Sequence, residues 1–353
     1  MKAFLPRIEI ALSQIRHNAQ VLTELYGRQG ISVMGVSKAV LGDPAIALAM
    51  LEGGVKFIAD SRLENIQRMR NAGVAAQFVL LRTALSQAEL VVLSADISLN
   101  TEIETISALS CFATIHRKIH QVILMVELGD LREGILPHDL SEFIQKVRSF
   151  PGIKIIGLGC NLACYGGIKP DNTKMNELSE LTDEMEAEFQ IDLKIISGGN
   201  SANHKWYESA QGVGRINNLR LGEAILLGRE TTSRETIPGL YTSAFRLIAE
   251  VIESKEKPSL PFGVVCQDSF GNIPSFQDRG IHRRIILALG KQDTLISGLQ
   301  PEQDLEILGS SSDHMILDSY NGDLKVGNEV VLNLDYGALL GAMTSPFIKK
   351  CLI

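Results

Sequence analysis

The sequence predicts an α/β protein: a TIM-type (β/α)8 barrel followed by a C-terminal all-β domain. Residues 12–232 alternate short apolar, β-branched runs with longer amphipathic stretches, as repeated βα units do. Residues 233–353 show only short strand-like runs separated by turn residues. A length of 353 residues is enough for a barrel and a second, smaller domain. The early run 7–11 also has strand character, and we expect it to join the second domain.

The predicted barrel has eight strands, each followed by a polar strand end. Between them lie stretches in which apolar residues recur at three- and four-residue spacing, which predicts helices. The clearest helices are 44–51, 62–71, 102–118, 140–150 and 175–189. The predicted strands are 31–37, 56–59, 77–81, 96–99, 121–126, 154–160, 193–196 and 218–221.

The second domain is predicted from its strand-like runs and its turns. Residues 239–258, 283–290, 314–319 and 328–334 read as strands, and Asn321-Gly322-Asp323 reads as a hairpin turn. No long helical pattern returns after residue 232, so we expect an all-β domain.

Composition favours a soluble globular protein with a small-molecule partner. Hydrophobic residues make up 45% of the chain and charged residues 21%, which excludes a largely disordered protein. The formal net charge of −7 provides no basic field for nucleic acid or an anionic membrane.

The cysteines indicate a reducing compartment. Their number, five, is odd, and they form neither a CxxC pair nor a zinc-type spacing, so we expect free thiols and no metal site. The N-terminal stretch lacks a signal-peptide pattern, and no apolar run is long enough to cross a bilayer. A cytoplasmic protein is therefore expected.

Chemistry in a TIM barrel lies at the carboxyl ends of the strands. Lys38 directly follows an apolar strand, so its amine would be partly buried at the barrel mouth. Burial lowers the pKa of a lysine and makes the amine nucleophilic, so Lys38 is a candidate for bonding to a carbonyl group.

A phosphate site is predicted on the opposite wall of the same barrel. The segment Ser197-Gly198-Gly199-Asn200-Ser201 follows the seventh strand and offers unobstructed backbone N–H groups, and Arg220-Leu221-Gly222-Glu223 completes that wall. A nucleophilic lysine facing a phosphate cradle is the arrangement that pyridoxal phosphate requires. We therefore expect this cofactor, with Asn200 among the residues that bind it.

Ten stretches give the chain a resemblance to a known family, the fold-type III pyridoxal phosphate enzymes related to alanine racemase, and within it to the ornithine racemase branch. The resemblance covers nearly the whole chain. The stretches are GVSKAVLGDP, ADSRLENI, ADISLNTEIETI, VELGDLREGI, NLACYGG, ISGGNSAN, INNLRLGEAILLGRE, DSFGN, DRGIHRRIILALGKQD and ILGSSSDHMILD.

The resemblance implies roles for particular residues. Lys38 matches the lysine that bonds to the cofactor and serves as one of two racemisation bases, and Arg132 matches the arginine that contacts the cofactor's phenolate oxygen. Asn161 stands where alanine racemases stack a histidine on the pyridine ring. Arg220 matches the arginine that donates to the pyridine nitrogen, which keeps that nitrogen unprotonated and discourages side reactions. The phosphate-binding positions are Ser201, Gly222 and Glu223.

The chain departs from alanine racemases at the second base. Their catalytic tyrosine, which the partner subunit provides, is missing from the corresponding segment 265–271. Cys266 is the nearest replacement, with Asp268 close by, and Asp313 and His314 match a second segment contributed across the dimer. Either Cys266 or His314 could act as the base on the opposite face, and each could equally be structural. Met125 stands where some alanine racemases carry a modified lysine.

We therefore expect an amino-acid racemase that acts by two-base proton transfer at Cα, on ornithine or a related diamino acid, as a homodimer. Carboxylates that could meet a distal ammonium ion are Asp60, Glu64, Asp268 and Asp313.

Three alternatives stay open. One is an alanine, serine or broad-specificity racemase. Another is a D-amino-acid aldolase or dehydratase, which the absence of a His-x-Cys metal pair near the C-terminus disfavours. The third is a non-catalytic pyridoxal phosphate carrier, which the extra β-domain disfavours.

Overall fold

The computed structural model of the chain describes residues 5–320 and 324–353. The chain divides into two compact units, one of residues 12–242 and one that combines the N-terminal residues up to Ala11 with residues 243–353. Residues 233–242 stay with the first unit, ten residues past the predicted boundary, because Ile237 N donates to Gly228 O (2.9 Å) and Tyr241 N to Asn18 Oδ1 (2.7 Å). The predicted turn at 321–323 lies outside the described residues.

The first unit is a closed barrel of eight parallel strands, as the sequence predicts. Each strand begins and ends within two residues of its predicted bounds. Apolar side chains such as Met34, Val79 and Met125 fill the interior, which makes the barrel a packed core. The strands are β2 (Ser32–Val36), β3 (Phe57–Asp60), β4 (Gln77–Leu80), β5 (Ile97–Asn100), β6 (His120–Met125), β7 (Ile153–Gly159), β8 (Ile195–Ser197) and β9 (Asn218–Leu221).

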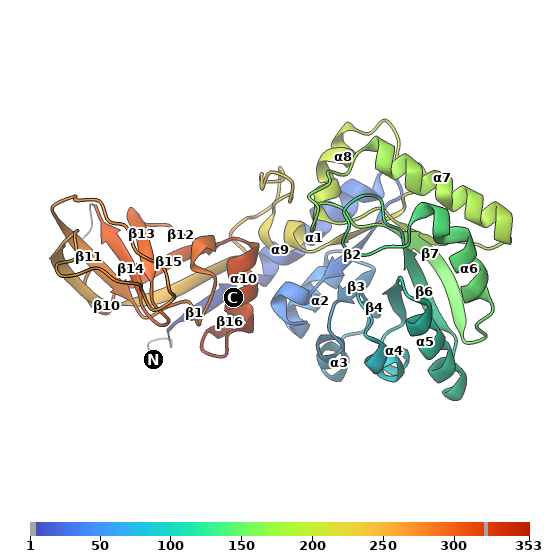
Figure 1. The fold of residues 1–353 in the computed structure, drawn as a ribbon, viewed down its shortest axis with the longest axis horizontal. Coiled ribbons are helices and arrows are strands. Elements are labelled where there is room, and N and C mark those ends of the chain that lie inside the picture. The colour runs from blue at the N-terminus through green and yellow to red at the C-terminus, as the bar shows by residue number, and fades with distance from the viewer. Residues whose placement is uncertain (1–4, 321–323) are drawn as a thin grey trace. The chain divides into compact units, whose positions relative to one another are not determined.

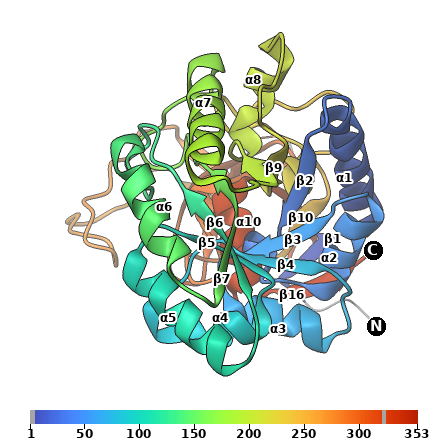
Figure 2. The same ribbon diagram turned by 90° about the vertical axis from the view of Figure 1, so that its right-hand side faces the viewer.

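Helices surround the barrel, as Figure 2 shows for α1 to α7. Their sequences alternate a buried apolar face with an exposed charged one, and α6 buries Leu140, Ile144 and Val147 in this way. The helices are α1 (Leu12–Gly27), α2 (Pro44–Glu52), α3 (Leu63–Asn71), α4 (Ala88–Ser94), α5 (Ile103–Ile115), α6 (Leu140–Arg148), α7 (Asn172–Phe189), α8 (His204–Ser209) and α9 (Glu223–Leu227).

The second unit is a β-domain built around the 14-residue strand β10. β1 pairs antiparallel with β10 and parallel with β16, so the two ends of the chain share one sheet; Figure 1 shows β1 in blue beside the red β16. The strands are β1 (Arg7–Ile10), β10 (Phe245–Pro258), β11 (Ile281–Leu287), β12 (Leu299–Pro301), β13 (Leu305–Ser310), β14 (Met315–Ser319), β15 (Glu329–Leu334) and β16 (Lys349–Leu352).

One helix in this domain departs from the expectation of strands alone. Helix α10 (Tyr336–Thr344) begins after Asp335, whose carboxylate accepts from Ala338 N at 2.8 Å. Its sequence, YGALLGAMT, contains two glycines, which lower helix propensity, and this conceals the helix in the sequence. Burial of Leu339, Ala342 and Met343 compensates for that low propensity.

Candidate active site

Lys38 lies at the carboxyl end of the first barrel strand. It opens the short helix η1 (Lys38–Val40), two residues after the end of β2, and is partly buried. Burial is the largest cause that lowers the pKa of its ammonium group. The cations Arg132 and Arg220 lower this pKa further, whereas Cys164 and Asp60 act in the opposite direction. The structure therefore places at the barrel mouth an amine that loses its proton more easily than an exposed lysine does.

Asp60 supports the strand end that precedes Lys38. It is fully buried, and its carboxylate accepts from Ser37 Oγ (2.7 Å), Arg62 N (2.9 Å) and Asn65 Nδ2 (3.0 Å). Because its oxygens are taken up in this way, the prediction that Asp60 meets a substrate's ammonium ion is not supported. Glu64 lies exposed on the first turn of α3.

Arg220 is a buried cation at the centre of the site. Only 5% of the residue is exposed. Its Nη1 donates to Ser197 Oγ (2.5 Å), and its Nη2 donates to Cys160 O (2.7 Å) and to Asn161 Oδ1 (3.4 Å). Burial lowers the pKa of Arg220, yet a guanidinium stays charged at neutral pH. These acceptors are all neutral, so among residues 5–320 and 324–353 no carboxylate is hydrogen-bonded to this guanidinium.

Asn161 and Asn200 lie beside Arg220, as the prediction of a shared site requires. Asn200 Nδ2 donates to Asn161 Oδ1 at 3.1 Å and to Leu162 O at 2.8 Å. The Nδ2 group of Asn161 is buried and has no hydrogen-bond partner in the described part of the chain. A buried donor without a partner is costly, so this atom favours a ligand that accepts from it.

Neighbouring strand ends bring the predicted phosphate residues together. Asn200 caps the short helix η4 (Ser201–Asn203), and Ser201 Oγ accepts from Ala224 N at 3.1 Å, in the turn that follows Gly222. Gly199 has φ +143°, and a Cβ there would lie 2.2 Å from Asn203 Oδ1, so this turn requires glycine. The short helices η4 and α9 therefore begin next to each other, and the N-terminus of a helix suits an anion.

Glu223 forms an ion pair within a loop that other charged residues organise. Its buried carboxylate pairs with Arg234, whose φ is +64°. Arg234 belongs to the turn that Glu230 organises: the Glu230 carboxylate accepts from the backbone and side chains of Thr232 and Ser233. Burial alone would raise the pKa of Glu230, but these donors outweigh it and lower the pKa from 4.5 to about 2. Sequence reasoning assigned no role to either Arg234 or Glu230. Glu230 ends the INNLRLGEAILLGRE stretch, but its role and that of Arg234 depend on the turn that forms there.

Arg132 enters the site from the loop after β6. Its guanidinium donates to the carboxylate of Glu133 and, at 2.8 Å, to Cys164 Sγ in the loop after β7. Asp130 joins the two loops, because its carboxylate accepts from the backbone N–H groups of Tyr165 (2.9 Å) and Cys164 (3.3 Å). Sequence reasoning missed Cys164, Asp130 and Glu133, although Cys164 lies inside the NLACYGG stretch and the other two lie inside VELGDLREGI.

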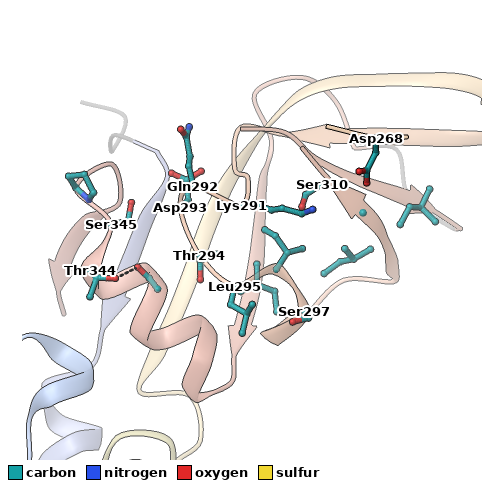
Figure 3. A pocket seen from close by; sticks show the side chains of 17 residues that line it. Asp268, Lys291, Gln292, Asp293, Thr294, Leu295, Ser297, Ser310, Thr344 and Ser345 are labelled. Carbon is teal, nitrogen blue, oxygen red and sulfur yellow. Dashed lines mark hydrogen bonds between the residues drawn. The ribbon is translucent and has the colours of Figure 1, made fainter. Parts of the chain in front are cut away.

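The predicted second-base residues lie in the β-domain, in two segments that lie close together there. Lys291 connects them: its ammonium lies 3.4 Å from the centre of the Phe270 ring, and its backbone N donates to Ser311 O at 3.0 Å. A hollow of about 990 Å³ begins here, and Figure 3 shows Asp268, Lys291 and Ser310 on its wall.

The two candidate bases differ in their surroundings. His314 is half-exposed, and its Nδ1 lies 2.8 Å from Asp313 Oδ1, so Nδ1 donates to the carboxylate and Nε2 remains available. This hydrogen bond lowers the pKa of Asp313. Cys266 is exposed, and its thiol has one long contact, 3.6 Å, to the carbonyl of its neighbour Gln267. Asp268 holds a turn by accepting from Phe270 N and Asn272 N. Of the two, His314 is the one whose side chain a carboxylate holds.

Two negative findings concern the described residues, 5–320 and 324–353. No helix among them is long and apolar enough to span a membrane. No group of three or more His, Cys, Asp or Glu side chains among them is arranged to hold a metal ion.

The fold and the site define a class: a closed (β/α)8 barrel with a partly buried lysine and a buried arginine at its mouth, continued by a β-domain. Residues 10–230 match the family described as alanine racemase, N-terminal domain, so the chain belongs to the alanine racemase family. Members of the same fold are known as structures. Alanine racemase of Clostridium difficile 630 aligns with a TM-score of 0.79 at 18% identity, over 100% of this chain and 97% of that one.

Curated relatives share the whole length of the chain. An ornithine racemase of Acetoanaerobium sticklandii is 41% identical over 99% of both chains. A lysine racemase of Thermotoga maritima is 38% identical over 98% of both chains. The alanine racemase of Bartonella henselae, whose structure is described as having covalently bound pyridoxal phosphate, aligns with a TM-score of 0.74 at 18% identity, over 99% of this chain and 100% of that one.

Glu230 makes stability depend on acid pH. Because its pKa is lowered from 4.5 to about 2, its contribution is present above pH 4.5 and is lost as the pH falls through 2. We expect Glu230→Gln to lose up to about 3 kcal/mol of unfolding free energy at pH 7 and to show a flatter decline in acid than the parent. Urea unfolding followed by fluorescence of Trp206, the single tryptophan, measures this. The control is Glu184→Gln, on the exposed face of α7, which should behave as the parent does. If the unfolding free energies of the parent and of Glu230→Gln fall equally with pH in acid, the role assigned to Glu230 is wrong.

Proposed function

We propose that the chain is a pyridoxal phosphate-dependent racemase of a diamino acid, with ornithine as the first candidate substrate. The observation that carries this proposal is the full-length similarity, at 41% and 38% identity, to an ornithine racemase and a lysine racemase. The geometry of the barrel mouth supports it, because Lys38, Arg220 and Asn161 meet there.

The residues at the barrel mouth fit this cofactor in three respects. Arg220 is a buried guanidinium with neutral acceptors, which suits donation to an unprotonated ring nitrogen. Asn161 Nδ2 is a buried donor that needs an acceptor. The turns at Ser201 and Gly222 present backbone N–H groups that suit a phosphate.

The mechanism assigns each residue a task. When bound, pyridoxal phosphate supplies a conjugated ring that withdraws electrons from the α-carbon of the substrate. Lys38 holds or removes a proton at that carbon through Nζ, and its lowered pKa supplies the free amine for this work. A guanidinium keeps its proton at neutral pH, so Arg220 would keep a ring nitrogen beside it unprotonated, which would limit charge delocalisation and favour return of the proton over other outcomes.

A second base on the opposite face completes racemisation. His314 fits this role because Asp313 orients its ring and leaves Nε2 available, and Cys266 is the other candidate. We assign these residues to a site shared within a homodimer, in which the β-domain of one copy serves the barrel of the other. The relatives' similarity extends through the β-domain, which supports a role for that domain in the reaction and disfavours a carrier without catalysis.

The first test is the reaction itself. Protein loaded with pyridoxal phosphate should interconvert D- and L-ornithine and exchange the α-proton in heavy water. Lys38→Ala should lower both rates at least about 1,000-fold, because it removes the amine that bonds the cofactor and moves the proton. Lys38→Arg is the matched control, since it keeps the positive charge without a free amine and should be equally impaired. If the parent racemises none of ornithine, lysine, serine and alanine, the proposed function is wrong.

The second base has its own signature. Its loss should slow proton removal from one enantiomer by roughly 10- to 100-fold more than from the other, because each base serves one face. We expect this asymmetry for His314→Ala and a smaller effect for Cys266→Ala, measured as α-proton exchange of each ornithine enantiomer. Co-expression of Lys38→Ala with His314→Ala chains should restore activity if the site is shared between copies. Unchanged exchange in both single variants would exclude the two residues.

A further inference from the structure

The loop between β6 and α6 carries Arg132 and its neighbour Glu133. Residues 127–135 leave the strand and return to it, since Ile135 N donates to Met125 O (2.8 Å) and Glu127 N to Ile135 O (2.9 Å). Gly134 allows this close return, because a Cβ there would lie 2.4 Å from Glu127 N. These two backbone hydrogen bonds close the loop, and Arg132 and Glu133 lie between the residues that they join.

The Arg132 guanidinium donates hydrogen bonds to two residues, Glu133 and Cys164. Its Nε and Nη2 donate to the two carboxylate oxygens of Glu133, which is a bidentate pairing, and its Nη1 donates to Cys164 Sγ at 2.8 Å. About a third of each side chain is exposed: 38% for Arg132 and 34% for Glu133. A long arginine at such a position would otherwise sample several rotamers, and a bidentate partner selects one of them.

We propose that Glu133 is a positioning residue for Arg132: it fixes the guanidinium in one orientation, with Nη1 on Cys164 Sγ, ready to meet the cofactor. The inference rests on the proposed function, because it concerns how this chain prepares the site for pyridoxal phosphate. It assigns a task to a side chain that the reaction scheme leaves unused.

The charges around Glu133 fit this task. Arg132 and Arg220 each lower the pKa of Lys38, and Arg132 also lowers the pKa of Arg220. Glu133 raises the pKa of both arginines, so it favours their charged forms. The carboxylate of Asp60 also raises the pKa of Lys38, but Ser37, Arg62 and Asn65 hold it at its own strand end, whereas Glu133 pairs directly with a member of the cluster. Glu133 therefore offsets repulsion within the cluster while it orients one of its members.

The test is a double-mutant cycle on cofactor affinity. The dissociation constant of pyridoxal phosphate is measured by absorbance titration of cofactor-free parent, Glu133→Ala, Arg132→Ala and the double variant. We expect Glu133→Ala to weaken binding about five- to tenfold and Glu133→Gln to weaken it less, because the amide oxygen keeps one hydrogen bond. In the Arg132→Ala background, Glu133→Ala should change the constant less than twofold, because the residue acts through Arg132.

Controls separate positioning from a general structural effect. Glu142→Ala removes another carboxylate that pairs with a cation, Lys146, on the exposed face of α6, and should leave the constant unchanged. The absorbance spectrum of the bound cofactor should change in Glu133→Ala and not in Glu142→Ala. The inference is overturned if Glu133→Ala changes the dissociation constant equally in the parent and in the Arg132→Ala background. It is also overturned if Glu133→Ala leaves the constant of the parent unchanged. If the parent itself neither binds the cofactor nor racemises ornithine, the proposed function fails, and this inference fails with it.

Discussion

The structure of the barrel mouth depends on one constraint, the burial of the Arg220 guanidinium. A buried charge is stable only when its N–H groups are hydrogen-bonded, and here Ser197, Cys160 and Asn161 provide the acceptors from two neighbouring strands. That requirement fixes the ends of β7, β8 and β9 relative to one another. Within the described residues, this positive charge is hydrogen-bonded to no carboxylate and lies next to an asparagine donor that has no partner. Such a site suits a ligand that carries acceptor atoms.

The other site residues are held by loops that bind each other. Asp130 fastens the loop after β7 to the loop after β6, and this brings Cys164 to Arg132. Glu230 folds the turn that holds Arg234 against Glu223. In both cases a carboxylate accepts backbone N–H groups that would otherwise be unpaired, so the loops that carry function gain the rigidity of the strands below them.

Much of this could be predicted from the sequence, because the strand period and the polar strand ends are local signals. All eight barrel strands were found, and Lys38, Arg220, Asn161 and Asn200 were expected at one end of the barrel, where the structure has them. Other features depend on three-dimensional contacts. Cys164 and Glu133 matter only because two loops meet, Asp60 is enclosed by its own strand end, and α10 forms despite two glycines because it is buried. The roles of His314 and Cys266 stay predictions, since they depend on how chains assemble.

The central claim is that Lys38 is the residue to which the cofactor bonds. Treatment of the pyridoxal phosphate-loaded protein with borohydride makes a bond between a lysine amine and the cofactor aldehyde permanent, and peptide mass spectrometry then locates it. The account predicts that the label is on Lys38 at close to one per chain and is absent from the other lysines. A label on a different lysine, or no label on protein that racemises ornithine, would contradict it.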